Sequence, residues 1–311
     1  MINPLQQIYK LPHIGLVFAL IYAFNFSLNG VFVKLLKDMD AITIMTYRSM
    51  VSLILLLPFI IVKRPILLPE KGKKLLLTRS ILSCTTYTVL FVAYRFVSFA
   101  DATAISLTAP ALTVIMERLA LKEPMGKFHW LAVFLSLAGV LLVTRPSYIF
   151  SGTTIDGKMG IGLGLAAFAA LFIASSTVIV RQLKHVNRLT LHLFYFGISV
   201  IVLVPITTVL QVWKLPSTPV EWILVLSIGA VGLLNQYFFC TALKLESAGA
   251  VNLITTTQVI FTYMWELLAF RATPFLENYI GAALISAAAI TIALVKIYKS
   301  KKISCIKRCV T

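Results

Sequence analysis

Charged residues are scarce in this 311-residue sequence, and acidic residues are the scarcest of them. Asp, Glu, Lys and Arg together make up 13% of the chain, whereas soluble globular proteins average about 25%. Hydrophobic residues reach 59%, and the mean hydropathy is +0.93. This composition excludes an ordinary soluble protein and predicts a chain that crosses a membrane several times.

Residues that bind metals or carry out covalent catalysis are also few. The sequence has four cysteines and four histidines, and none has the spacing of a zinc site. Only His192 lies away from the edges of an expected membrane span. We find no catalytic triad and no Walker motif. The sequence therefore predicts no metal, no cofactor and no enzymatic activity.

Long apolar runs are what the sequence has instead. A helix of about 20 apolar residues spans the roughly 30 Å hydrocarbon core of a bilayer. Ten runs of about that length follow one another along the chain: 13–33, 41–62, 78–97, 102–121, 128–145, 160–180, 190–212, 220–240, 248–270 and 276–296. We predict an all-α membrane protein with ten transmembrane helices.

The basic residues behind the net charge of +17 are divided unequally between the two expected sides of the membrane. If the N-terminus is cytosolic, most basic residues fall on the cytosolic side, including those of 71–79, 118–127 and the tail after residue 296. This bias predicts that both termini are cytosolic, in the plasma membrane or an endomembrane. It indicates attraction to anionic lipid, and no nucleic-acid partner. Cys305 and Cys309, in the basic tail, are candidates for palmitoylation.

The chain contains a long internal repeat. Residues 14–37 align without gaps on residues 161–184, an offset of 147, and residues 98–124 return in blurred form as 247–274. An offset that holds over five spans indicates a duplicated five-helix unit, and an odd number of spans requires the second copy to be inverted. We therefore predict two inverted five-helix repeats, divided as follows: residues 1–145, first repeat; 146–159, linker; 160–296, second repeat; 297–311, basic cytosolic tail.

Each repeat carries a stripe of polar residues in its fourth span. The residues are spaced as neighbours along one helical face, in an apolar background. Polar groups in a lipid-embedded helix are costly, so we expect both stripes to line a water-filled cavity between the repeats. The two stripes are Ser106, Pro110, Thr113 and Glu117 in the first repeat, and Thr255, Gln258, Thr262 and Glu266 in the second.

Six further residues are cavity candidates: Tyr22, Asn25, Asn29, Arg48, Asn235 and Asn252. The first three share one face of the first span, where the alternative is interhelical hydrogen bonding. Arg48 lies about 10 Å inside the second span, so it requires a partner. It is either an anion-binding or gating arginine or one half of a structural pair. We hypothesise that Arg48 and Glu266 form an outer gate.

Several segments resemble a known family. They are ADATAISLTAPALTVIMERLALKEP (100–124), LAVFLSLAGVLLVTRP (131–146), GLAAFAALFIASSTVIVRQL (164–183) and ALKLESAGAV (242–251). The first two resemble the EamA repeat of the drug/metabolite transporter superfamily, and the others are similar to the G subgroup of solute carrier family 35. The resemblance implies a ten-helix carrier with cytosolic termini. The two repeats differ at one position of this segment: Glu123 in the first repeat has no acidic counterpart in the second.

The favoured function is a secondary transporter that moves a small organic solute by alternating access between the repeats. Arg48, Arg95 and Arg271 near the outer mouth favour an organic anion or metabolite. The alternative is a membrane interaction or regulatory protein that keeps the fold without transporting. The expected partners are a small-molecule substrate and the lipid bilayer. Small residues in the sixth span favour internal helix packing, with a homodimer seam as the other use.

Overall fold

The computed structural model describes residues 14–36, 38–63, 72–93, 96–97, 99–121, 126–144, 146, 149, 156–270 and 276–310. Within these ranges the chain is almost entirely helical and contains no strand. Several parts of the sequence analysis lie outside them: the N-terminal 13 residues, most of the linker, Arg95, Glu123 and Arg271. The side chains of Glu266, Cys305 and Cys309 are likewise not described.

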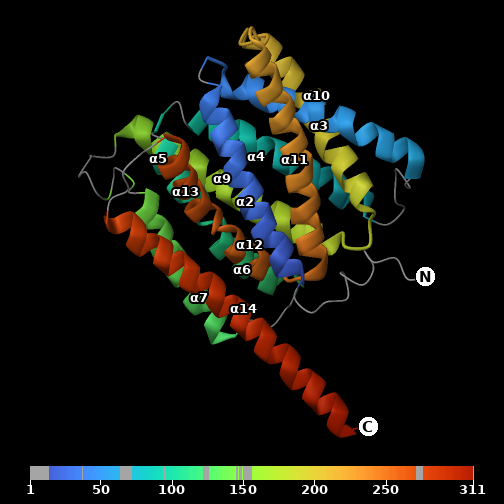
Figure 1. Cartoon of the computed structure of the whole chain (residues 1–311), viewed down its shortest axis with the longest axis vertical. Helices are drawn as coiled ribbons and strands as arrows, with labels where there is room; N and C mark the ends of the chain where they lie inside the picture. The colour runs from blue at the N-terminus through green and yellow to red at the C-terminus, as the bar shows by residue number, and fades with distance from the viewer. Residues whose placement is uncertain are drawn as a thin grey trace.

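The order of the helices along the chain is the same in the two repeats (Figure 1). The first repeat contains α2 (Ile14–Leu35), α3 (Ala41–Lys63), α4 (Lys73–Ala93), α5 (Phe99–Ser106), α6 (Ala109–Leu121) and α7 (Lys127–Thr144). The second contains α9 (Gly157–Gln182), α10 (Arg188–Val209), α11 (Pro219–Leu245), α12 (Ala248–Thr255), α13 (Gln258–Phe270) and α14 (Leu276–Val310).

Six of these helices are long and apolar enough to cross a membrane: α2, α3, α7, α9, α10 and α11. A shorter apolar stretch, Tyr279–Val295, lies within α14. Many large apolar side chains on these helices are exposed, such as Ile61 at 70% and Ile201 at 71%. A soluble protein would not leave so many uncovered, so lipid is their expected surroundings. The chain is an integral membrane protein.

The fourth span of each repeat is broken, whereas we expected continuous helices over 102–121 and 248–270. The first break separates α5 from α6 at residues 107–108, and the second separates α12 from α13 at residues 256–257. Thr108 and Thr257 are 149 residues apart and make equivalent hydrogen bonds at the two breaks. Each donates its hydroxyl to the carbonyl three residues earlier, Ile105 or Ile254, at 2.7 Å. Such local bonds compete with the regular helical ladder.

The two repeats are interleaved, because the helices of each repeat pack chiefly against helices of the other. The main helix pairs are unchanged when the repeats are exchanged. The first helix of each packs on the third of the other, giving the pairs α2 with α11 and α9 with α4. The second helices α3 and α10 pack on each other, and so do the fifth helices α7 and α14. Figure 1 shows α7 and α14 side by side, with α14 projecting beyond the bundle to the C-terminus.

Corresponding helices of the two repeats run in opposite directions. Near the start of α3, the Thr43 hydroxyl donates to the Val212 carbonyl just beyond the end of α10, at 2.6 Å. Near the end of α3, Leu56 packs on Tyr195 and Phe196, early in α10. The halves of the fourth spans are antiparallel too, because Asn252 lies beside Thr113 while the start of α12 meets the end of α6.

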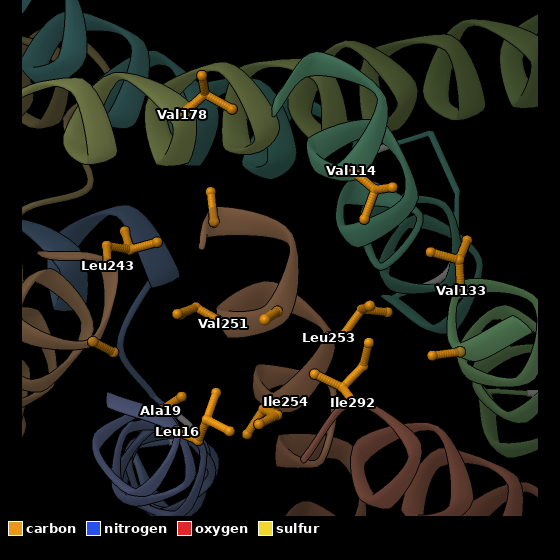
Figure 2. Close-up of a cluster of buried hydrophobic side chains, with 14 of the residues drawn as sticks. Leu16, Ala19, Val114, Val133, Val178, Leu243, Val251, Leu253, Ile254 and Ile292 are labelled. Carbon is orange, nitrogen blue, oxygen red and sulfur yellow. The ribbon is translucent and has the colours of Figure 1, made fainter. Parts of the chain in front are cut away.

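The core of the molecule surrounds α12, in which every residue is buried. Figure 2 shows apolar side chains from the neighbouring helices around it. They include Leu16 of α2, Val114 of α6, Val178 of α9 and Leu243 of α11. A helix covered on all sides belongs in a protein interior rather than at a lipid surface. The first half of the second broken span is therefore the centre of the fold.

Two helix ends differ from the expected spans. The third helix begins at Lys73, five residues before the expected start at residue 78. The last helix does not end near residue 296 but continues through the tail to Val310. The earlier start of α4 matters most, because it moves Arg79 from the expected membrane edge to a position inside a helix.

Candidate functional site

The two broken spans meet at Glu117, near the end of α6. Its side chain is fully buried. One carboxylate oxygen accepts the backbone N–H of Ala248 at 2.6 Å, and the other accepts that of Gly249 at 2.7 Å. These N–H groups are the unpaired donors of the first turn of α12, where a negative charge also suits the helix dipole. Glu117 of the first repeat thus caps a broken helix of the second.

A second polar contact joins the same two helices one turn further along. The Asn252 side-chain amide donates to the Thr113 hydroxyl at 2.6 Å, and that hydroxyl donates to the Ala109 carbonyl at 2.8 Å. Both side chains are buried. Nearby, Ser136 of α7 donates to the Thr256 hydroxyl in the second break, at 3.1 Å. The crossing is therefore held by hydrogen bonds between the repeats, within an apolar surround.

The remaining stripe residues of described placement make local bonds. Ser106 donates to the Ala102 carbonyl at 2.7 Å, and Thr255 donates to the Asn252 carbonyl at 2.8 Å. Thr262 donates to the Gln258 carbonyl at 2.9 Å, and both of these side chains are half-buried. Pro110 is buried in the first turn of α6. The structure thus brings Thr113 and Glu117 to α12, whereas the other stripe residues of described placement bond only within their own helices.

The polar face of α2 is half-buried. The Tyr22 ring lies 4.8 Å from the Phe239 ring of α11, and the Asn25 amide donates to the Ile21 carbonyl at 2.9 Å. The side-chain oxygen and nitrogen of Asn29 are buried and make no hydrogen bond. Asn235 of α11, which is 1% exposed, likewise makes none with either side-chain atom. Buried amides without partners are rare in proteins, and they mark a place that can accept a polar ligand or water.

Arg48 lies in the interface between α3 and α11 and is 7% exposed. Its side chain passes over Gly232, where a Cβ atom would lie 2.6 Å from Nε. One guanidinium nitrogen donates to the Met45 sulfur at 3.5 Å. The absence of a side chain at residue 232 therefore provides the space that Arg48 fills. Because the Glu266 side chain is not described, the proposed gate between Arg48 and Glu266 stays a prediction.

A second buried arginine, Arg79 of α4, was missed by the sequence analysis, which counted it among the cytosolic basic residues. It is 2% exposed, and its guanidinium carbon lies 4.8 Å from the centre of the Tyr195 ring in α10. The signal was present in the sequence. Lys73 and Lys74 are followed by three leucines, residues 75–77, and only then by Arg79. The two lysines are therefore better candidates than Arg79 for the residues at the membrane edge.

No group of three or more His, Cys, Asp and Glu side chains that could hold a metal occurs in the part of the chain that the structure describes. His192 of α10 is 1% exposed and lies beside the Tyr237 ring of α11. The buried polar groups of the described residues include hydroxyls, amides, histidines, the capping carboxylate of Glu117 and two arginines. Such a set can bind a small polar molecule, and its members come from both repeats.

Comparison with known proteins places this arrangement in context. The model of the EamA-like transporter family matches twice, over residues 13–145 and 160–294. Human solute carrier family 35 member G1 is 30% identical over 94% of this chain and 82% of its own length. The pseudopaline exporter CntI of Pseudomonas aeruginosa is 27% identical, over 91% of this chain and 96% of its own. One solved crystal structure superposes with a TM-score of 0.75 at 14% identity, covering 91% of this chain and 98% of that one.

Proposed function

This chain belongs to the EamA-like transporter family, and from that premise we propose that it carries a small organic solute across a membrane by alternating access. The family and the relatives named as transporters support the class of activity. The observation that carries the mechanism is the crossing of two broken helices at the centre of the bundle. Secondary transporters built from inverted repeats form their substrate sites from such discontinuous helices.

The proposed topology has ten membrane crossings in two inverted repeats, with each broken pair counted as one crossing. The antiparallel course of α3 and α10 supports the inversion. Both termini are then cytosolic, as the basic residues indicate. Such a chain is suited to the plasma membrane or an endomembrane, and it acts as a carrier rather than an enzyme.

Alternating access follows from the interleaved packing. Because each helix packs chiefly on the other repeat, a rocking motion of one repeat changes these contacts in a concerted way. We propose that the buried, unpartnered amides of Asn29 and Asn235 face substrate in this cycle, together with Tyr22 and Asn25. Glu117 and Asn252 hold the broken helices in register while the repeats move.

The test is uptake by the purified protein in proteoliposomes. The panel contains carboxylates, amino acids and nucleotide-linked metabolites, and protein-free liposomes serve as the blank. A carrier gives saturable uptake of at least one solute, accelerated when the same solute is loaded inside. A Gly164→Ala variant, at a position where a Cβ atom meets no other atom within 4 Å, serves as the matched active control. Folded protein that moves no member of the panel above the blank contradicts the proposal.

A further inference from the structure

The groups that contact the Arg79 guanidinium directly are neutral. One guanidinium nitrogen, Nη2, donates to the Gln236 side-chain oxygen at 3.2 Å and approaches the Cys240 sulfur at 3.9 Å. The other, Nη1, donates to the Leu191 carbonyl at 3.4 Å, which is a long bond. The Tyr195 ring covers one face of the guanidinium, and Nε is buried without a partner. No carboxylate is among these contacts in the described part of the chain.

The neighbours of Arg79 add positive charge. His192, also fully buried, has two ring nitrogens that make no hydrogen bond. The charged side chains that act on it electrostatically are all cationic within the described residues: Arg79, Arg188 and Lys244. Lys244 is held by the Val186 carbonyl. We call Arg79, His192, Tyr195, Gln236 and Lys244 the Arg79 cluster.

A buried cation of this kind is normally paired with an anion, because removing a charge from water is costly. Arginine suits oxyanions in particular, since its planar fork of N–H donors matches two oxygens at once. The free Nε–H of Arg79 lies on the edge of the guanidinium, where such an oxyanion binds. His192 and the Gln236 amide can add further hydrogen bonds.

The cluster bridges the two repeats. Arg79 belongs to α4 of the first repeat, whereas Gln236 and Lys244 belong to α11 and His192 and Tyr195 to α10 of the second. A relative movement of the repeats therefore separates Arg79 from its present neighbours and opens its donors to solvent. In the arrangement seen here Arg79 is 2% exposed, so a ligand would bind in the arrangement that this movement opens.

We propose that the Arg79 cluster binds the carboxylate or phosphate group of a small organic anion, and that this anion is the transported solute. The inference rests on the proposed carrier function and names its substrate class. It assigns the anion to Arg79, a residue that the sequence placed at the cytosolic edge of the third span. Arg48, in the corresponding interface of α3 with α11, is not required for it.

The test measures binding and transport separately on the full-length protein. The probes are succinate for carboxylates, uridine monophosphate and inorganic phosphate for phosphates, and glucose as a neutral solute. Binding is measured as a thermal shift and by calorimetry in detergent, and transport as uptake into proteoliposomes. Arg79→Gln removes the charge, and Arg118→Gln removes the same charge from an exposed position of α6 as the matched control.

We expect at least one anionic probe, and not glucose, to stabilise the wild-type protein. Arg79→Gln should weaken that binding by about 10- to 100-fold, as expected for lost charge-assisted hydrogen bonds, whereas Arg118→Gln should leave it within about twofold. Binding of succinate alone identifies the carboxylate, and binding of both phosphate probes identifies the phosphate. If Arg79→Gln does not fold, Gln236→Leu keeps the charge and should raise KM for the anion with little change in kcat.

Two results would overturn the anion site: wild-type protein that binds none of the anionic probes, or an Arg79→Gln variant that binds them as tightly as wild type. Uptake of glucose without anion binding would reject the site while leaving the carrier function intact. Anion binding that depends on Arg79 but comes with no uptake of any solute would support the site and reject the carrier function.

Discussion

Glu117 ties one repeat directly to the other. Its two carboxylate oxygens accept hydrogen bonds from two backbone N–H groups in the first turn of α12, which have no carbonyl partner within that helix. In Glu117→Gln, one carboxylate oxygen becomes a side-chain NH₂ group. We expect this NH₂ group to face a backbone N–H group of α12, so that two hydrogen-bond donors oppose each other. The free energy of unfolding should fall by about 2 kcal/mol. Denaturant unfolding in detergent measures this change.

The control for Glu117 is its neighbour Arg118, which is exposed. Arg118→Gln alters the same helix turn and removes a charge without touching α12, so its unfolding free energy should stay within about 0.5 kcal/mol of wild type. Equal stability of the two variants would show that the cap contributes nothing.

The sequence could predict that Glu117 is inside the protein but not what it binds. Its position on one helical face with two hydroxyl residues and Pro110 predicted that it lines a water-filled cavity between the repeats. Its partners are the backbone groups of Ala248 and Gly249, more than a hundred residues away, and backbone N–H groups leave no signature in side-chain spacing. Arg79 shows the opposite case, since the helix begins five residues before the expected start and Arg79 therefore lies in the protein interior rather than at the membrane edge.

At the scale of the helices, the contact between α7 and α14 depends on two glycines. A Cβ atom at Gly139 would lie 2.6 Å from the backbone oxygen of Gly281, and one at Gly281 would lie 2.6 Å from that of Gly139. Backbone atoms cannot move aside as a flexible side chain can. We expect Gly139→Ala to push the helices apart and lower the unfolding free energy by about 1–3 kcal/mol.

Gly164→Ala is the matched substitution for this prediction, because its added methyl group meets open space on α9. Alanine is the better helix former, so this variant should be as stable as wild type or slightly more stable. Thermal unfolding of the two variants side by side provides the comparison. A Gly139→Ala protein as stable as Gly164→Ala would refute the close packing of α7 on α14.

The broken helices show where prediction from sequence stops at this scale. The apolar runs over 102–121 and 248–270 have the length of single spans, and length was the signal we used. Pro110 marked the first break, because proline lacks the N–H that would continue the ladder. The second break has no proline, only the run Thr255 to Thr257, whose three hydroxyls all bond to carbonyls three residues earlier. Threonine runs also occur in unbroken helices, so this signal was ambiguous.

For the whole molecule, the proposed inverted topology predicts that equivalent positions lie on opposite sides of the membrane. Asp38 and His185 are exposed and 147 residues apart, the offset of the repeat. The test uses a variant of the protein without its four native cysteines and a thiol reagent that cannot cross the membrane. We expect Asp38→Cys to react only from the side opposite the cytosol. We expect His185→Cys to react only from the cytosolic side. Labelling in oriented vesicles measures both. Reaction of both cysteines from one side would rule out inversion.

The sequence predicted the duplication well, because a repeated alignment survives whatever the helices pack against. It could not predict that the repeats are interleaved. Two five-helix units could equally lie side by side as separate bundles, and nothing in the spacing of apolar residues distinguishes these arrangements. The distinction comes from contacts such as the bond from Thr43 to Val212, which no local pattern encodes.

The central claim is that the two repeats move against each other during transport, and a reversible cross-link between them tests it most directly. Thr46 of α3 and Thr207 of α10 lie in different repeats and their side-chain hydroxyl oxygens are 2.8 Å apart, so cysteines at these two positions can be joined by oxidation. With a solute found in the uptake panel, the account predicts that oxidation of this pair in proteoliposomes stops uptake and that reduction restores it, while each single-cysteine variant is unaffected. Full uptake by the cross-linked protein would contradict the account.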